Sequence, residues 1–233
     1  MMRIAAILGA LIVALGLIAV FNRPVIGATF CPACFGFRSI APSIYVERGG
    51  TAPLDAAVLT NVRQAKEKIA SFFGGETAGP MLLICTTESH YRALEGRQGG
   101  PKAITWNGRA TLASPRGNNV VILTHELAHA EWESRLNLGV RSTVPAWFNE
   151  GLATYISDDP RYIGSSQSGN RCLASPDEPL PTSERDWDRA ELYPRAACRV
   201  NLWLASHGGH QGVLRLIADL NQGMPFDRAY GAP

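Results

Sequence analysis

The chain has 233 residues, of which 46% are hydrophobic and 18% are charged, and its formal net charge is +2. This composition is that of a globular protein. The small net charge, without a run of five or more basic residues, gives no reason to expect nucleic-acid binding. The length suits one membrane segment followed by a single domain.

The first predicted element is a membrane segment at residues 1–23. Arg3 precedes an uncharged apolar stretch from Ile4 to Phe21. This stretch is longer than a usual signal-peptide core and approaches the roughly 20 residues that span a bilayer. We expect an uncleaved signal anchor, with a cleaved signal peptide as the alternative. The basic Arg3 predicts a single-pass protein whose domain lies outside the cytosol, periplasmic in a Gram-negative cell, or a secreted protein if the segment is cleaved.

Residues 24–41 are predicted to be a juxtamembrane linker, and they contain two of the five cysteines, Cys31 and Cys34. Their spacing resembles that of a thioredoxin-type dithiol. The pair follows a membrane segment instead of a strand, so a structural disulfide, local or long-range, is favoured over a redox site. Cys172 and Cys198 flank a polar loop and make a reasonable disulfide in an exported domain. Since five is odd, at least one thiol is free or bonded to another chain.

The remaining residues, 42–233, are predicted to form one domain that mixes strands and helices. Alternating or continuous apolar residues predict strands, the last two joined by an Asn-Gly turn: Ser43–Glu47, Met81–Cys85, Lys102–Trp106 and Arg109–Ala113. Helical periodicity predicts helices over 54–72, from 120 onward, and over 145–155, 190–206, 210–221 and 225–230. Residues 158–189 are polar and predict a long surface loop, which either borders a cleft or is simply solvated.

Residues 125–129 read His-Glu-Leu-Ala-His, the most informative pattern in the chain. Positions i and i+4 lie on one face of a helix, so His125 and His129 can hold one metal ion together. Glu126, the residue after His125, lies about 100° further round the helix, where its carboxylate can reach a metal-bound water. Asn118 and Asn119 stand where an N-cap is wanted. The pentapeptide alone also fits an amphipathic helix with two partly buried histidines.

A second apolar helix, predicted over 145–155, carries Glu150 in its middle. A buried carboxylate must be paired or bound to a metal, whereas an exposed Glu150 on the polar side of its helix needs no partner. With His125 and His129, Glu150 completes three protein ligands and leaves a fourth position open. That arrangement describes catalytic zinc, because structural zinc is usually closed by four ligands. The sequence therefore predicts one Zn²⁺ per chain and a zinc hydrolase.

Two segments together resemble the gluzincin metallopeptidases, the clan of thermolysin and aminopeptidase N. They are His125-Glu126-Leu127-Ala128-His129 and Trp147-Phe148-Asn149-Glu150-Gly151-Leu152-Ala153. The second is similar to the Trp-Leu-Asn-Glu-Gly-Phe-Ala stretch of the aminopeptidase N branch. The likeness spans about residues 105–230. It implies an α+β zincin fold, with a small mixed sheet packed on helices, and a peptide or protein substrate.

The resemblance also implies roles for individual residues. Glu126 would be the general base. Tyr193, which opens a helix ending at Gly208-Gly209 as in the aminopeptidase N branch, would stabilise the oxyanion; a surface or core tyrosine is the alternative. Tyr155 is a second candidate for that role. In thermolysin-like folds a strand before the zinc helix binds substrate backbone, and residues 110–114 match it, so we expect peptide to add to that edge.

The sequence departs from this clan in two respects. The interval between His129 and Glu150 is slightly longer than in thermolysin. The sequence also lacks the Gly-x-Met-Glu-Asn segment with which the aminopeptidases of the clan bind the amino terminus of a substrate. An endopeptidase is therefore favoured over an aminopeptidase. Two alternatives stay open: a non-catalytic zinc-binding protein for envelope assembly, with no need of Glu126, and a thiol redox protein that uses Cys31 and Cys34. His207 and His210 are either cleft residues or surface histidines.

Overall fold

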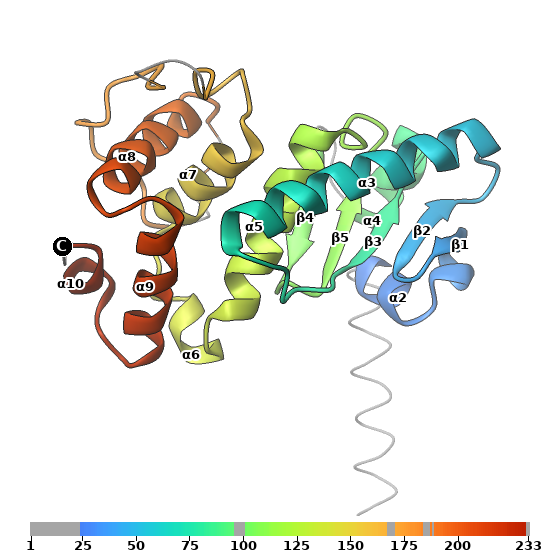
Figure 1. The fold of residues 1–233 in the computed structure, drawn as a ribbon. Coiled ribbons are helices and arrows are strands. Elements are labelled where there is room, and N and C mark those ends of the chain that lie inside the picture. The colour runs from blue at the N-terminus through green and yellow to red at the C-terminus, as the bar shows by residue number, and fades with distance from the viewer. Residues whose placement is uncertain (1–23, 96–100, 167–170, 184–186, 188, 232–233) are drawn as a thin grey trace, which may run out of the picture.

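The computed structural model describes residues 24–95, 101–166, 171–183, 187 and 189–231. One half of the molecule is a five-stranded sheet with the order β1-β2-β3-β5-β4, and the other half is helical (Figure 1). The β1–β2 and β4–β5 pairs are antiparallel, whereas β2–β3 and β3–β5 are parallel, so the sheet is mixed. The strands are β1 (Phe37–Ala41), β2 (Ile44–Glu47), β3 (Met81–Ile84), β4 (Ala103–Trp106) and β5 (Ala110–Ala113).

Helices cover both faces of this sheet. The helices α3 (Ala52–Phe73) and α5 (Val120–Arg135) pack on the face that carries Val46, Leu82 and Ile84. The opposite face carries Leu83 and Leu112, and it packs on α2 (Pro24–Phe30) and α4 (Glu88–Glu95). Because side chains alternate along a strand, the neighbours Leu82 and Leu83 enter the two different cores. A one-turn 3₁₀ helix, η1 (Pro32–Phe35), links α2 to β1.

The helical half packs against α5, which lies between the two halves of the molecule (Figure 1). Its helices are α6 (Leu138–Arg141), α7 (Ala146–Ser157), α8 (Leu192–Ser206), α9 (His210–Asn221) and α10 (Phe226–Tyr230). Helices α7 and α8 approach closely at Gly151, where a Cβ would lie 2.6 Å from the carbonyl oxygen of Ala196. The glycine beside Glu150 thus lets the two helices pack with their backbones almost in contact.

The predicted mixture of helices and strands is confirmed, and each predicted strand and helix is present within a few residues of its expected bounds. Among the described residues, five short elements were not predicted: α2, η1, β1, α4 and α6. The structure differs from the predicted linker at residues 24–41, because β1 pairs with β2 and Phe37 is buried in the core beneath α2. The described residues between 158 and 189 form neither helix nor strand, as expected.

The described part of the chain has no helix long and apolar enough to cross a membrane. The predicted membrane segment, residues 1–23, lies outside the described residues. Two disulfides are present: Cys172–Cys198, as predicted, and the local pair Cys31–Cys34. The fifth cysteine, Cys85, is a buried free thiol.

The expected substrate-binding edge was assigned to the wrong strand. Residues 110–113 form β5, which lies between β3 and β4, so both of its edges are already paired. The hairpin folds so that its second strand joins β3 in parallel, which leaves the first strand, β4, as the edge. The register pairs Ile104 with Leu112, and Lys102 accepts a hydrogen bond from Ser114. The backbone groups of Ala103 and Thr105 therefore point away from β5, toward an edge that pairs with no other strand in the described part of the chain.

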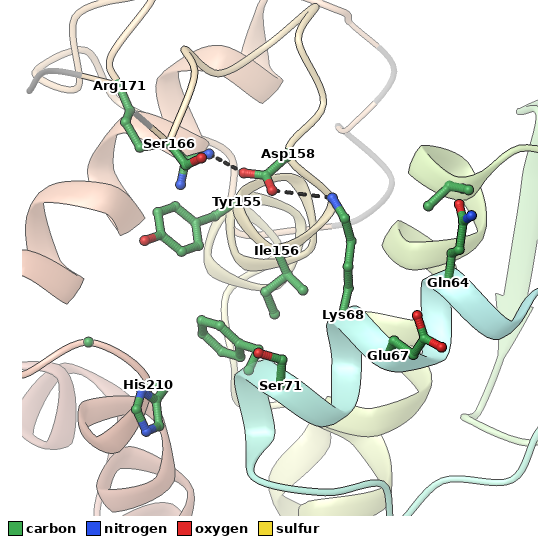
Figure 2. Close-up of a pocket in the computed structure, with 13 residues that line it drawn as sticks. Gln64, Glu67, Lys68, Ser71, Tyr155, Ile156, Asp158, Ser166, Arg171 and His210 are labelled. Carbon is green, nitrogen blue, oxygen red and sulfur yellow. Dashed lines mark hydrogen bonds and ion pairs between the residues drawn. The ribbon is translucent and has the colours of Figure 1, made fainter. Parts of the chain in front are cut away.

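The long loop that follows α7 is tied back to the body at its start. Asp158 pairs with Lys68 on α3 (3.2 Å) and with Arg171, as Figure 2 shows. Arg171 also donates a hydrogen bond to the Gly164 carbonyl (3.0 Å). The neighbouring Cys172 forms a disulfide with Cys198 on α8. The hollow in Figure 2 is lined by these charged groups and by Tyr155. Because Asp158 pairs with both cations, they serve to hold the loop in place.

Loss of the Glu131 side chain on α5 should destabilise the sheet half, because this buried carboxylate binds the segment that precedes β3. Its side chain is 1% exposed and accepts hydrogen bonds from the Thr77 and Ala78 amides (2.8–3.0 Å) and from Arg135 (2.7 Å). Glu131→Ala takes the acceptor from these part-buried donors, so we expect the free energy of unfolding to fall by about 1–3 kcal/mol. Urea denaturation measures this.

The matched control for that substitution is Glu67→Ala. Glu67 also pairs with an arginine at i,i+4 spacing, Arg63 at 3.1 Å, but its side chain is 61% exposed. Exposed pairs contribute about 0–1 kcal/mol, so this variant should unfold almost as the parent does. Equal losses in the two variants would contradict a special role for Glu131.

Candidate metal centre

Helix α5 presents both histidines of the motif on one side. Its N-terminus is fixed by Asn119, whose side-chain oxygen accepts a hydrogen bond from the Ile122 amide at 3.0 Å, as the predicted N-cap requires. The His125 and His129 rings follow one turn apart, with centroids separated by 4.8 Å. Leu123 and Leu127 are buried in the core on other sides of the helix.

The predicted ligands His125, His129 and Glu150 converge, with one ligand atom of each within 4.8 Å of the others. The two Nε2 atoms are 3.1 Å apart. Glu150 places Oε2 at 3.2 Å from Nε2 of His125 and Oε1 at 3.7 Å from Nε2 of His129. Ligands 2.0–2.1 Å from a tetrahedral zinc ion lie about 3.3 Å from one another, so the spacing of these donors fits such an ion.

A hydrogen bond selects which nitrogen of His129 faces this centre. The Nδ1 atom lies 3.0 Å from Oδ1 of Asn149. When Nδ1–H donates to this oxygen, Nε2 keeps a free lone pair directed toward His125 and Glu150. Asn149 therefore orients the ring for metal binding, a role that its position beside Glu150 did not reveal in the sequence.

Charge at the centre is balanced between the acid and the histidine. Burial disfavours the charged form of His129, but the carboxylate of Glu150 and smaller contributions from Glu126 and Asn149 outweigh it and raise the pKa of His129. Burial likewise opposes ionisation of Glu150, yet His129 and His125 hold its pKa below the usual value. The raised pKa of His129 and the lowered pKa of Glu150 both favour the charged forms, so the two side chains attract each other.

Glu126 lies beside the ligand group without being part of it. Its side chain is buried. Together with Glu150 and residues of the edge strand β4, it lines a cavity of about 320 Å³. One oxygen, Oε2, accepts a hydrogen bond from the hydroxyl of Thr105 on β4 at 2.8 Å. The predicted general base is thus at the cavity wall between the sheet edge and the three ligands.

Tyr193, at the start of α8, lines the same cavity. Its ring centroid is 6.2 Å from that of His125, and Tyr162 stacks on it at 4.9 Å. Trp187 packs edge-on against it at 5.6 Å. Burial, and then the negative charge of Glu150, raise the pKa of Tyr193, so at neutral pH its hydroxyl remains a hydrogen-bond donor.

The long loop after α7 borders the cleft, which settles one of the alternatives that the sequence left open. It contributes Trp187 to the cavity around Glu126, and Asp159, Arg161 and Tyr162 to an adjoining hollow of about 280 Å³. Buried Asp159 bonds with Arg161, which outweighs the effect of burial and lowers the pKa of Asp159; His125 lowers it further. No sequence pattern around these loop residues indicated that they would reach the metal centre.

Other residues singled out in the sequence lie elsewhere. Tyr155 lines the hollow of Figure 2, where Arg171 covers its ring at 4.5 Å. His207 stacks on Trp203 with centroids 4.6 Å apart, and His210 lines the hollow of Figure 2. None of the three lines either hollow beside the metal ligands.

The centre is therefore assembled from α5, α7, the edge strand β4, the start of α8 and the loop that connects α7 to α8. No protein-family model matches the chain, and no curated protein matches it significantly.

Proposed function

We propose that this protein is a zinc metallopeptidase of the gluzincin type, held outside the cytosol by its apolar N-terminal segment. The observation that carries the proposal is the convergence of His125, His129 and Glu150, with the unligated carboxylate of Glu126 in the same cavity. Two nitrogens and one oxygen form a donor set that suits zinc and leaves room for a fourth ligand. The two disulfides agree with an oxidising compartment.

Each residue of the cavity has a place in peptide-bond hydrolysis. Glu126 accepts the proton of the attacking water and later delivers it to the leaving nitrogen. Tyr193 donates its hydroxyl proton in a hydrogen bond to the oxygen that becomes negative, a contribution of about 3 kcal/mol for one donor. Zinc, when bound, would polarise the carbonyl group and lower the pKa of water.

The edge strand β4 supplies a binding surface for an extended peptide. The backbone groups of Ala103 and Thr105 face the free edge, and both residues line the cavity beside Glu126. A peptide that adds to this edge as a sixth strand places one of its bonds next to the metal ligands. Binding by strand addition depends on hydrogen bonds to main-chain groups of the peptide, so it favours unfolded or extended segments of protein as substrates.

Metal content and hydrolysis test the proposal together. The full chain, purified in detergent and loaded with zinc, should contain about one zinc per chain by elemental analysis. It should also cleave peptide bonds in unfolded casein or a mixed peptide library, read by mass spectrometry, and a chelator should stop the cleavage. Zinc binding without cleavage of any substrate would favour the non-catalytic alternative. Failure to bind zinc would overturn both.

The buried environment of Glu126 favours the enzyme over the non-catalytic alternative. A zinc-binding assembly factor needs the three ligands, but it needs no carboxylate held by a hydrogen bond within the same cavity. The redox alternative does not account for this cavity, since Cys31 and Cys34 lie on the far side of the sheet from α5.

A further inference from the structure

We infer that Thr105 positions Glu126 for catalysis, as the middle member of a hydrogen-bonded series Thr111–Thr105–Glu126. This inference rests on the proposed function, because it concerns the general base of that reaction. The two threonines lie opposite each other on β5 and β4, and their hydroxyl oxygens are 2.8 Å apart. The Thr105 oxygen is also 2.8 Å from Oε2 of Glu126.

Burial fixes the direction in which these hydroxyls donate. Thr111 is fully buried, and its hydroxyl has Thr105 as its hydrogen-bond partner. If Thr105 donated to Thr111, the proton of Thr111 would lack an acceptor and the carboxylate of Glu126 would face a lone pair. Both costs vanish when Thr111 donates to Thr105 and Thr105 donates to Glu126. The series therefore points its donors toward the carboxylate.

The consequence is that the two oxygens of Glu126 have different tasks. Oε2 is held by Thr105 at the sheet, with the Glu126 carbonyl also within 3.2 Å of the same hydroxyl. Oε1 is the oxygen left to accept the proton of water. A carboxylate fixed in this way does not have to rotate into place during the reaction, which is how preorganised groups lower an activation barrier.

Thr105 also links substrate binding to this orientation. Its backbone groups face the free edge of β4, where we propose that peptide binds, while its side chain contacts Glu126. A peptide that pairs with β4 fixes the backbone of Thr105 and so fixes the hydroxyl that holds the base. One residue thereby contacts both the substrate strand and the catalytic carboxylate.

Thr105→Val tests the inference, because valine has the same shape without the hydroxyl. We expect kcat to fall about 10- to 100-fold, the value of one hydrogen bond to a charged group, with KM and zinc content unchanged. Thr105→Ser, which restores the hydroxyl, should recover kcat to within about threefold of the parent. Thr111→Val should lower kcat less than Thr105→Val does, since Thr105 still donates to Glu126 in that variant.

Thr143→Val is the control for the loss of a threonine hydroxyl. Its hydroxyl bonds to the Val140 carbonyl at 2.7 Å on an exposed turn. Parental kcat in Thr105→Val, or a loss that serine does not restore, would overturn the inference. Crystal structures of zinc-loaded parent and Thr105→Val give a readout without hydrolysis: the carboxylate of Glu126 should turn away in the variant. An unchanged carboxylate would overturn the inference even if the parent cleaves no substrate, an outcome that would separately count against the proposed function.

Discussion

Glu126→Gln is expected to lower the rate of peptide hydrolysis by about 10²–10⁴-fold while the protein keeps one zinc per chain. Glutamine has nearly the same shape and can still accept from Thr105 through its amide oxygen, but it cannot take up the proton of water. Because Glu126 lies outside the ligand group, its loss leaves the three metal ligands in place. Steady-state kinetics and elemental analysis of the same sample measure both quantities.

The control is Glu67→Gln on α3, the same substitution at an exposed position away from the cleft. It should retain the parental rate. Parental activity in Glu126→Gln would exclude the general-base role and with it the mechanism proposed above. Loss of zinc together with activity would instead show that Glu126 contributes to the metal site, which the geometry does not support.

His129→Ala is expected to remove the stabilisation that zinc gives to the folded chain. A ligand that binds only the folded state at 1,000 times its dissociation constant adds about 4 kcal/mol to the free energy of unfolding. The parent should therefore unfold at a higher temperature as zinc is added, and His129→Ala should not respond. Calorimetry over a zinc titration measures the difference.

His207→Ala is the matched control, since His207 stacks on Trp203 away from the centre. This variant should keep the full response to zinc. A response of His129→Ala equal to that of the parent would show that zinc binds elsewhere on the chain.

The zinc-free protein should be most stable in a mildly acidic window. The pKa of His129 is raised above its ordinary 6.5, so its contribution is complete below that pH and is lost as pH rises through the folded-state pKa. The pKa of Glu150 is lowered below 4.5, so its contribution is complete above that pH and is lost as pH falls through the folded-state pKa. Both contributions are complete between about pH 4.5 and 6.5.

Urea denaturation of zinc-free parent and Glu150→Gln across this range measures the effect. The difference in stability between the two proteins should be greatest inside the window and smaller on either side. A difference that does not change with pH would contradict a charged pair at the centre. Zinc itself should bind more tightly as pH rises, because His129 must lose its proton to become a ligand.

The cluster of His125, His129 and Glu150 was predictable because it depends on short-range sequence patterns. A spacing of four residues places His125 and His129 on one face of any helix, and Asn119 is a strong N-cap. Glu150 stands out as a carboxylate within an apolar helix. Each of these inferences needs only the periodicity of one element, and the structure brings the three side chains together as expected.

The groups that support these ligands were not predictable in this way. Thr105 reaches Glu126 across 21 residues of sequence, and Asp159 and Trp187 reach the cleft from a loop without periodicity. The edge of the sheet was assigned wrongly because strand order depends on long-range pairing, whereas a hairpin signal reports only that two strands are adjacent. The short elements β1 and α4 have too few residues to show a repeat and are formed by their contacts with the core.

The disulfide between Cys172 and Cys198 encloses most of the loop that walls the cleft. A single cut in the exposed stretch of this loop, for instance beside Leu173, would divide the chain in two without separating the pieces. One piece would carry His125, His129 and Glu150, and the other would carry Tyr193. Such a nicked protein would migrate as one species on a non-reducing gel and as two after reduction, so damage of this kind is invisible unless the sulfurs are reduced.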